Sequence, residues 1–461
     1  MRVEFLQEFG EGRGARYNRI FYTAASRKTR SPMASDIRSR LTPLDENGKA
    51  LVHNYVFDQA AHQNLPQKVI FWDETLRDGE QTPGLFFTVE EKVEIAKMLD
   101  DLGVGIMDVG IPVVSPKEFE ACKAIAREGT HNAVILAAAR AVKRDIDACV
   151  DAGAEETSIF IAVSDLHLKY KLKMTREQCL NAAVESIEYA KERGIERCFV
   201  TEDTVRADLE FVAELYNAAI GAGAKRAVIC DTVGVCTPST AKWFVREFKK
   251  RVKPVQLSWH GHNDFGMAVA NTLAALEEGV EIPHGCVNGI GERAGNASLE
   301  EMIMALEVLY GKETGIKIEK VFEVSKRIEE LTGIPLAAQK PLVGTNAYSH
   351  ESGIHTHGIL KHTLTYEPIM PEMIGRKREF VFGKHTGTTS VEEKLKDNAV
   401  DFKPEQVQKL TELIKEVAEG KTKADYREYI RSHHEHEHLR RGVSDGEFWQ
   451  LAAKVGLKPR L

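Results

Sequence analysis

The chain has 461 residues, 43% of them hydrophobic, and a formal net charge of −7. This length exceeds one average domain, but a single α/β barrel with an appendage can use most of it. No apolar run approaches the roughly eighteen residues of a membrane span, and the modest, dispersed charge argues against nucleic acid or a membrane surface as a partner. Small-molecule chemistry is therefore the expected function.

The cysteines and the N-terminus bear on the compartment of the protein. The 7 cysteines are scattered and never form a CxxC pair, so the sequence indicates neither a disulfide framework nor a thiolate zinc site, and we expect a cytoplasmic protein. Residues 1–65 are predicted to form a partly disordered N-terminal extension. Its start is basic and Ser-rich, but it contains Glu4 and Glu8 and no secretory apolar core. A transit peptide or a start at Met33 are alternatives for this segment.

Residues 68–84, KVIFWDETLRDGEQTPG, join a short apolar run to a dense set of charges. Val69–Trp72 is β-branched and aromatic and too short for a helix, which predicts a strand. After this strand, Asp78 could hold a divalent cation, while the neighbouring Arg77 binds a carboxylate or a polarised carbonyl. The alternative is a surface loop in which opposite charges merely pair.

The next segments repeat one pattern of a β-rich run followed by an amphipathic helix. Residues 88–103 have helical apolar spacing, a capping box of Thr88 and Glu91, and a terminal Gly103. Further strands are predicted at 106–110, 133–139, 157–163, 197–203, 226–232, 255–260 and 285–290. Further helices are predicted at 115–127, 142–152, 175–193, 208–222, 238–251, 264–278 and 298–310. Eight such pairs predict an α/β fold, a closed (β/α)8 TIM barrel over residues 66–310.

The remainder is predicted to be smaller and mostly helical. Residues 311–395 carry Gly and Pro punctuation and the histidine-rich HESGIHTHG, which indicates a lid-like subdomain contributing to the active site. Residues 396–461 are predicted to form a C-terminal helical region, because apolar residues recur there at intervals of three and four.

Polar side chains fall at the carboxyl ends of the predicted strands, where the mouth of a TIM barrel lies. They are Asp73 to Gln81, Arg140, Ser164, His167, Glu202, Asp203, Asp231, Thr232, His260, His262 and Glu292 to Asn296. Surface polarity placed at random would not follow strand ends.

One metal site would explain several of these positions. In SWHGHND, His260 and His262 lie two residues apart on an extended segment, so both side chains share one face. Strands 7, 8 and 1 become neighbours when the barrel closes, so Asp78 and Asn296 would meet these histidines. Two imidazoles and a carboxylate leave open positions for a substrate. A lone HxH is also compatible with a structural pair.

Seven motifs together resemble one enzyme family, the isopropylmalate, homocitrate and citramalate synthases, which are metal-dependent barrels related to hydroxymethylglutaryl-CoA lyase. The motifs are DETLRDGEQTPG, DVGIPVVSP, SDLHLKYKLKM, CDTVGVCTPS, HGHNDFGMAVANTLAALEEG, NGIGERAGNASLEE and NAYSHESGIHTHG. The resemblance covers residues 66 to 395. It implies condensation of acetyl-CoA, as co-substrate, with a 2-oxo acid, and a divalent metal (Mn, Mg or Zn).

The resemblance also implies roles for single residues. It makes Asp78, His260, His262 and Asn296 metal ligands, with Asn296 acting directly or through a metal-bound water. It makes Arg77, Glu202 and His355 catalytic, with His350 and Tyr366 as alternatives to His355 as the base. Gln81, Arg140 and Thr232 are assigned to substrate binding, and Thr232 matches the threonine that binds the 2-oxo acid carboxylate. The family further implies a homodimer or higher homo-oligomer in which His355 acts in the neighbouring subunit.

The oxo acid stays open at this point. GIPVVSP, Ala139 with Arg140, and HLKYKLKM look most like the isopropylmalate branch, which implies 2-oxoisovalerate and a role in leucine biosynthesis. The chain ends at residue 461, without the regulatory domain usual in that branch, so no leucine inhibition is expected. Arg140 could face the distal carboxylate of 2-oxoglutarate (homocitrate synthase) or oxaloacetate (Re-type citrate synthase), or be structural. Pyruvate (citramalate synthase) is a further alternative. A lyase is disfavoured because GIGERAGN lacks the cysteine of the lyase loop.

Overall fold

A computed structural model describes residues 37–54, 64–128, 132–421, 423–436, 443–455 and 457. The chain divides into two units, residues 1–53 and 54–461. The described part of the first unit contains helix α2 (Ile37–Arg40) and an antiparallel bridge between Leu44 and Ala50. Most of the predicted N-terminal extension, including Met33, lies outside the described residues.

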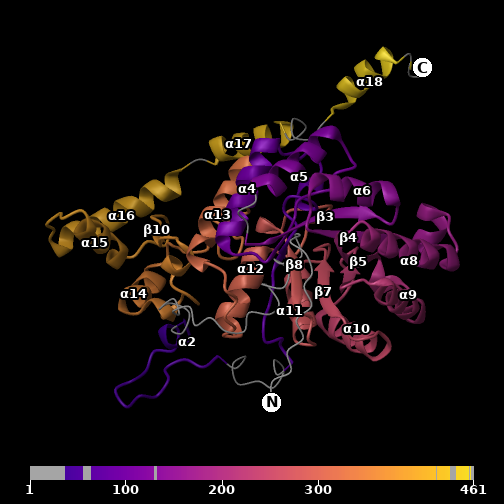
Figure 1. Cartoon of the computed structure of the whole chain (residues 1–461). Coiled ribbons are helices and arrows are strands. Elements are labelled where there is room, and N and C mark those ends of the chain that lie inside the picture. Colours follow the sequence, from indigo (N-terminus) through magenta and orange to yellow (C-terminus); the bar gives the residue numbers. More distant parts are fainter. Residues whose placement is uncertain are drawn as a thin grey trace. The chain divides into compact units, whose positions relative to one another are not determined.

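Eight parallel strands close into a barrel, with each strand paired to the next and β1 paired to β8, which confirms the predicted TIM barrel (Figure 1). The strands are β1 (Trp72–Asp73), β2 (Ile106–Asp108), β3 (Val134–Arg140), β4 (Glu156–Ala162), β5 (Glu196–Glu202), β6 (Arg226–Asp231), β7 (Gln256–Gly261) and β8 (Ile282–Gly285).

Helices follow the strands, and all except the three-residue helix Asp165–His167, which lies at the mouth, cover the outside of the barrel. They are α4 (Val89–Leu102), α5 (Pro116–Glu128), α6 (Lys143–Ala152), α7 (Asp165–His167), α8 (Arg176–Glu192), α9 (Leu209–Ala222), α10 (Pro238–Arg251), α11 (Ala268–Leu276) and α12 (Leu299–Met304). Capping residues in the sequence help determine where these helices begin and end. Thr88 and Glu91 form the predicted capping box of α4, and Gly103 ends that helix with a φ of 105°.

Two predicted strands are displaced in the structure. Val69–Phe71 is buried but precedes the ladder, because the register with β2 begins at the pair Trp72 and Ile106. The eighth strand is Ile282–Gly285 rather than 285–290. Asn288 and Gly289 have φ values of 62° and 70°, which no strand tolerates, so the chain turns there and the N–H of Gly289 donates to the Cys286 carbonyl at 3.0 Å. Pro283 lies inside the eighth strand, and proline is a poor strand former, so the sequence does not reveal a strand there.

Two helices also differ from the prediction. The predicted helix 264–278 begins only at Ala268, because Gly266 takes a φ of 73° in the preceding loop. There Asn263 Oδ1 accepts a hydrogen bond from the N–H of Ala268 at 3.1 Å. The predicted helix 298–310 is divided into α12 and a π-helical turn at Ala305–Leu309.

The segment after the barrel is mostly helical, as predicted. Its helices are α13 (Val321–Thr332), α14 (Gly353–Lys361), α15 (Thr388–Asp397), α16 (Pro404–Gly420), α17 (Ala424–His436) and α18 (Asp445–Lys454). The strands β9 (Ser349–His350) and β10 (Glu379–Phe380) form a small parallel sheet within it. The further division into a subdomain at 311–395 and a helical region at 396–461 stays a prediction.

The core lies between the strands and the outer helices, and the seven cysteine thiols are all free and buried. Burial raises the pKa of each of these thiols. Among the helices within the described ranges, none combines the length and apolar character needed to cross a membrane.

The packing of α10 makes a stability prediction. Phe248 is 1% exposed and stacks edge-on against Tyr216, whereas Trp243 on the same helix is 54% exposed. Phe248→Ala should therefore lower the free energy of unfolding by about 3–5 kcal/mol, because it opens a cavity in the core. Denaturant unfolding measures this change, and Trp243→Ala, the matched control, should stay within about 0.5 kcal/mol of the parent chain. Equal effects of both substitutions would contradict the packing described.

Candidate active site

The neighbouring strands β7, β8 and β1 bring together polar groups at the carboxyl end of the barrel. The loop after β8 then returns to β7, where His262 and Asn296 form an antiparallel bridge and the N–H of Asn263 donates to the Gly295 carbonyl at 2.9 Å. Asp78 enters from the loop after β1. Barrel closure thus assembles residues that are more than two hundred positions apart in sequence.

Three side chains converge with geometry suited to a cation. His260 Nε2 and His262 Nε2 lie 3.1 Å apart, and Asp78 Oδ2 lies 3.8 Å and 3.6 Å from these two nitrogens. All three residues are buried, and they form a group able to hold a metal ion. One carboxylate and two imidazoles suit zinc or manganese and leave positions open for a ligand.

Asn296 lies against this group and is 2% exposed. Its amide nitrogen donates to Asp78 Oδ2 at 2.7 Å and to the Ile290 carbonyl at 3.1 Å, whereas its buried Oδ1 has no hydrogen-bond partner within the described part of the chain. A buried acceptor without a partner is costly unless an ion, water or ligand meets it. The donor set therefore fits a cation, and the role of Asn296 as a ligand stays a prediction.

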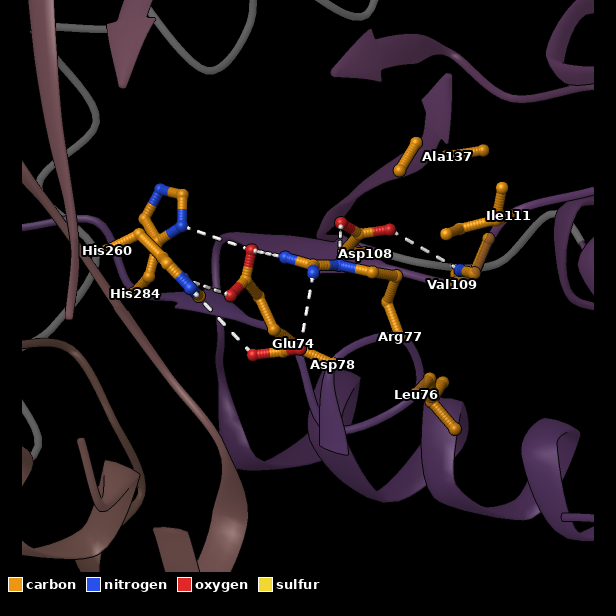
Figure 2. A network of polar contacts seen from close by, with 12 residues as sticks. Glu74, Leu76, Arg77, Asp78, Asp108, Val109, Ile111, Ala137, His260 and His284 are labelled. Carbon is orange, nitrogen blue, oxygen red and sulfur yellow. Dashed lines mark hydrogen bonds and ion pairs between the residues drawn. The ribbon is translucent and has the colours of Figure 1, made fainter. Parts of the chain in front are cut away.

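Glu74 organises the back of the site, and sequence reasoning gave it no role. It is 2% exposed, its Oε2 lies 2.6 Å from His260 Nδ1, and its Oε1 lies 3.2 Å from His284 Nδ1 (Figure 2). Glu74 also forms an ion pair with Arg77. With Nδ1 of His260 facing this carboxylate, the tautomer that leaves Nε2 unprotonated and available to a metal is favoured.

Burial and neighbouring charges shift the pKa values of Glu74 and His262. Burial alone raises the pKa of Glu74, but Arg77, His260 and His284 outweigh it and hold the pKa well below the usual range. Burial, followed by the charge of His260, lowers the pKa of His262 to about 4. His262 is therefore neutral near pH 7, as metal ligation requires.

Arg77 is held among three carboxylates, as Figure 2 shows. Besides the pair with Glu74, its Nε donates to Asp108 Oδ2 at 3.1 Å, and its Nη1 lies 3.5 Å from Asp78 Oδ1. Asp108 ends β2, is 1% exposed, and was also missed. Burial raises the pKa of Asp108 to about 7, although Arg77 opposes this shift. The guanidinium is thus fixed in one orientation beside the metal-binding group.

The predicted residues on β5 and β6 also meet at the mouth. Thr232 Oγ1 accepts a hydrogen bond from the N–H of Asp203 at 2.8 Å, so its own proton remains available to a ligand. Glu202 Oε1 lies 2.6 Å from Lys171 Nζ and 3.3 Å from His167 Nδ1. Neither Lys171 nor His167 had been given a role.

The remaining predicted residues lie apart from this group. Gln81 is exposed in the 3₁₀ turn Gly79–Gln81. Arg140 forms two hydrogen bonds, of 2.6 Å and 3.0 Å, with the buried carboxylate of Asp145. His355 is exposed on α14 and stacks on Tyr366 with 4.3 Å between ring centroids. Within the described residues of one chain, no hydrogen bond or ion pair joins His355 to the metal-binding group.

A common signal marks Glu74, Asp108 and His284: each is a polar residue at, or just after, the carboxyl half of a barrel strand. Glu74 and Asp108 stood in motifs already noted in the sequence. His284 was hidden because the eighth strand had been placed three residues too late.

Comparison with known proteins identifies the group to which the chain belongs. The HMGL-like family model matches residues 68–328, and the model described as homocitrate synthase post-HMGL domain-like matches residues 342–422. A hydroxymethylglutaryl-CoA lyase structure from Bacillus subtilis aligns over 60% of this chain and 97% of its own, with a TM-score of 0.54 and 22% identity. That likeness supports the barrel fold alone.

Curated relatives are more similar in sequence. A probable 2-isopropylmalate synthase from Ignicoccus hospitalis is 49% identical over 77% of this chain and 89% of its own length. A homocitrate synthase AksA from Methanothermobacter thermautotrophicus is 45% identical over 80% and 93%. A putative (R)-citramalate synthase CimA from Methanopyrus kandleri is 47% identical over 80% and 73%. The chain belongs to the HMGL-like family, within the group of its synthases.

Proposed function

We propose that this protein condenses acetyl-CoA with a 2-oxo acid by a metal-assisted Claisen reaction followed by thioester hydrolysis, and that the oxo acid is 2-oxoisovalerate, giving 2-isopropylmalate and CoA. The convergence of Asp78, His260 and His262 beside a fixed Arg77 carries this proposal. The similarity to isopropylmalate, homocitrate and citramalate synthases supports the reaction class.

The metal would be held by Asp78, His260 and His262, with the unpartnered oxygen of Asn296 available to it or to a water. When bound, a divalent ion supplies Lewis acidity toward the carbonyl of the oxo acid. The chain sets up this chemistry in advance, because Glu74 orients His260 and the low pKa of His262 keeps that ring neutral.

Arg77 has the electrostatic role. The acetyl methyl loses a proton, the resulting carbanion forms a bond to the carbonyl carbon, and negative charge develops on the former carbonyl oxygen. A guanidinium already held by Glu74 and Asp108 stabilises that charge without reorganising during the reaction. Thr232, whose hydroxyl proton is available, donates to the carboxylate of the oxo acid. Water then cleaves the thioester and releases CoA.

The base is assigned to His355, assisted by Glu202, and a second copy of the chain would supply His355. Large apolar side chains are exposed on the βα loops of the mouth, which suggests a covering partner: Phe86 (74%), Val114 (69%) and Phe265 (70%). His355 and its neighbour Ile354 are likewise exposed on α14. A homodimer in which α14 covers the partner's mouth would bury both surfaces.

The pairing of Arg140 with Asp145 supports the choice of 2-oxoisovalerate as the substrate. Two hydrogen bonds tie its guanidinium to Asp145, and the strength of such a pair disfavours its release to bind a second carboxylate. The distal end of 2-oxoisovalerate is an isopropyl group, which needs no cationic partner.

A panel of 2-oxo acids tests the reaction and its substrate. With acetyl-CoA and Mn²⁺, CoA release should be fastest with 2-oxoisovalerate and slower with pyruvate, 2-oxoglutarate and oxaloacetate. Chelation should abolish the release, because the side chains of Asp78, His260 and His262 cannot replace the Lewis acidity of the ion. Added Mn²⁺ should restore it. Turnover with 2-oxoglutarate or oxaloacetate alone would refute the assignment of the oxo acid.

Arg77→Lys tests the role of the guanidinium. A lysine is a point charge and cannot bond Glu74 and Asp108 in the same planar arrangement. We expect kcat to fall by about 100-fold while the fold and the affinity for Mn²⁺, measured by calorimetry, are retained. Arg176→Lys, on an exposed arginine paired with Asp165, is the matched control and should keep its kcat. Near-normal turnover of Arg77→Lys would contradict this role and would favour the alternative, in which Arg77 merely forms ion pairs in a surface loop.

Mixing two inactive variants tests the shared site. If His355 acts in the partner's barrel, co-expressed Arg77→Lys and His355→Ala chains form hybrids with one intact site, and about a quarter of the parent activity should return. Each variant alone stays inactive and serves as its own control. Activity no higher than the two separate variants would place His355 in its own barrel or outside the reaction.

A further inference from the structure

A buried ammonium lies behind the pair formed by Arg77 and Asp108, and nothing in the proposed reaction uses it. Lys92 on α4 is 1% exposed, although lysine is rarely buried in proteins. Its Nζ lies 2.6 Å from Glu80 Oε2 and 2.7 Å from Glu118 Oε2. These three residues are called the Lys92 cluster below.

The same ammonium also contacts the main chain next to Arg77 and next to Asp108. It donates to the Leu76 carbonyl at 3.1 Å and lies 3.5 Å from the Val109 carbonyl. Leu76 immediately precedes Arg77, and Val109 immediately follows Asp108. Figure 2 shows Leu76 beside Arg77 and Val109 beside Asp108.

The two carboxylates of the cluster accept hydrogen bonds from the same two loops. Glu80 Oε1 accepts from the N–H of Phe87 at 2.7 Å, in the loop after β1. Glu118 Oε1 accepts from the N–H of Ile111 at 3.1 Å, in the loop after β2. Each contact of the cluster with the main chain is therefore made to the loop after β1, which carries Arg77, or to the loop after β2, which follows Asp108 directly.

Gly110 leaves room for this arrangement. Its φ is 135°, and a Cβ there would lie 1.8 Å from Glu118 Oε1. Its N–H lies 3.4 Å from Asp108 Oδ1 on the other side. One glycine therefore separates the cluster from the carboxylate that holds Arg77, so a shift of Glu118 would be transmitted to Asp108.

We propose that Lys92 is a positioning residue, which holds the carbonyls of Leu76 and Val109 at a fixed separation and thereby sets the distance between Arg77 and Asp108. An apolar residue could fill the same space, and replacing a buried ion pair by apolar groups is often neutral for stability. Stability therefore does not explain why a lysine is buried here. The contacts of Lys92 with the two loops are better explained by a need to keep Arg77 in a fixed position. This inference rests on the proposed function, because turnover is its main readout.

The test compares the parent chain with Lys92→Met and with the triple variant Lys92→Met/Glu80→Gln/Glu118→Gln, in which no cluster charge is left unpaired. We expect kcat for CoA release to fall roughly 10- to 100-fold in both variants, with KM for the oxo acid changed less than about threefold, because misplacing a catalytic group acts mainly on kcat. Folding of the triple variant is checked by its Tm.

A double-mutant cycle separates positioning from general destabilisation. In an Asp108→Asn background, Lys92→Met should cost less than about a further threefold in kcat, because the pair that Lys92 positions is already broken. Arg226→Met/Glu156→Gln is the matched control, since it removes a buried ion pair of 2.9 Å at the amino ends of β6 and β4. This control should leave kcat unchanged, whatever its effect on Tm.

Several outcomes would overturn the inference. These are an unchanged kcat in the folded triple variant, or a loss in the Asp108→Asn background as large as in the parent chain. Should the Lys92 variants fail to fold, Glu118→Gln alone keeps Lys92 in place and must still lower kcat non-additively with Asp108→Asn. A parent chain that releases no CoA with any oxo acid would refute the proposed function itself, whereas an active parent chain with additive losses would refute only the role of Lys92.

Discussion

The carboxylate of Glu74 is the group on which the site depends. An isolated buried carboxylate costs several kcal/mol, so its position requires compensating donors from all sides. Arg77 from the same loop, His260 from β7 and His284 from β8 provide them. The pairing of β1 with β8 brings these donors together, so the closed barrel itself orients the catalytic groups.

The mouth is further held by contacts that pass from one βα loop to the next. Arg293, in the loop after β8, pairs with Asp264 after β7 at 2.8 Å and donates to the Thr232 carbonyl after β6 at 2.6 Å. Thr232 in turn accepts from the N–H of Asp203 at β5. Such a chain of contacts restricts the loops on which a substrate would rest, so little ordering is left to be done on binding.

The sequence predicted the architecture well because the βα repeat is a local pattern. Capping residues such as Thr88 and Gly103 mark helix ends directly. The convergence of Asp78, His260 and His262 was also predictable, since HxH and the Asp78 motif fall at strand ends whose meeting point follows from barrel closure. The eighth strand was misplaced because Pro283 is a poor strand former, while the residues after it have strand-like composition but left-handed dihedral angles.

The supporting groups were not predictable for a different reason. Glu74, Asp108 and Lys92 act through contacts with partners distant in sequence, and a position at a strand end does not indicate which partner a charged residue will meet. Arg140 shows the converse: the sequence assigns this charged residue at a strand end to the substrate, and in the structure its guanidinium pairs with Asp145, five residues later on α6. Deciding between such roles requires the distances themselves.

The burial of all seven thiols has a practical consequence for studying this protein. Only thiolates react with aromatic disulfide reagents, and burial both shields these sulfurs and raises the pKa of each. The folded chain should therefore be silent toward such a reagent, which reports only the CoA set free. Any chain that unfolds would add its seven thiols in a burst, so the same colour change counts product in one phase and damaged protein in another.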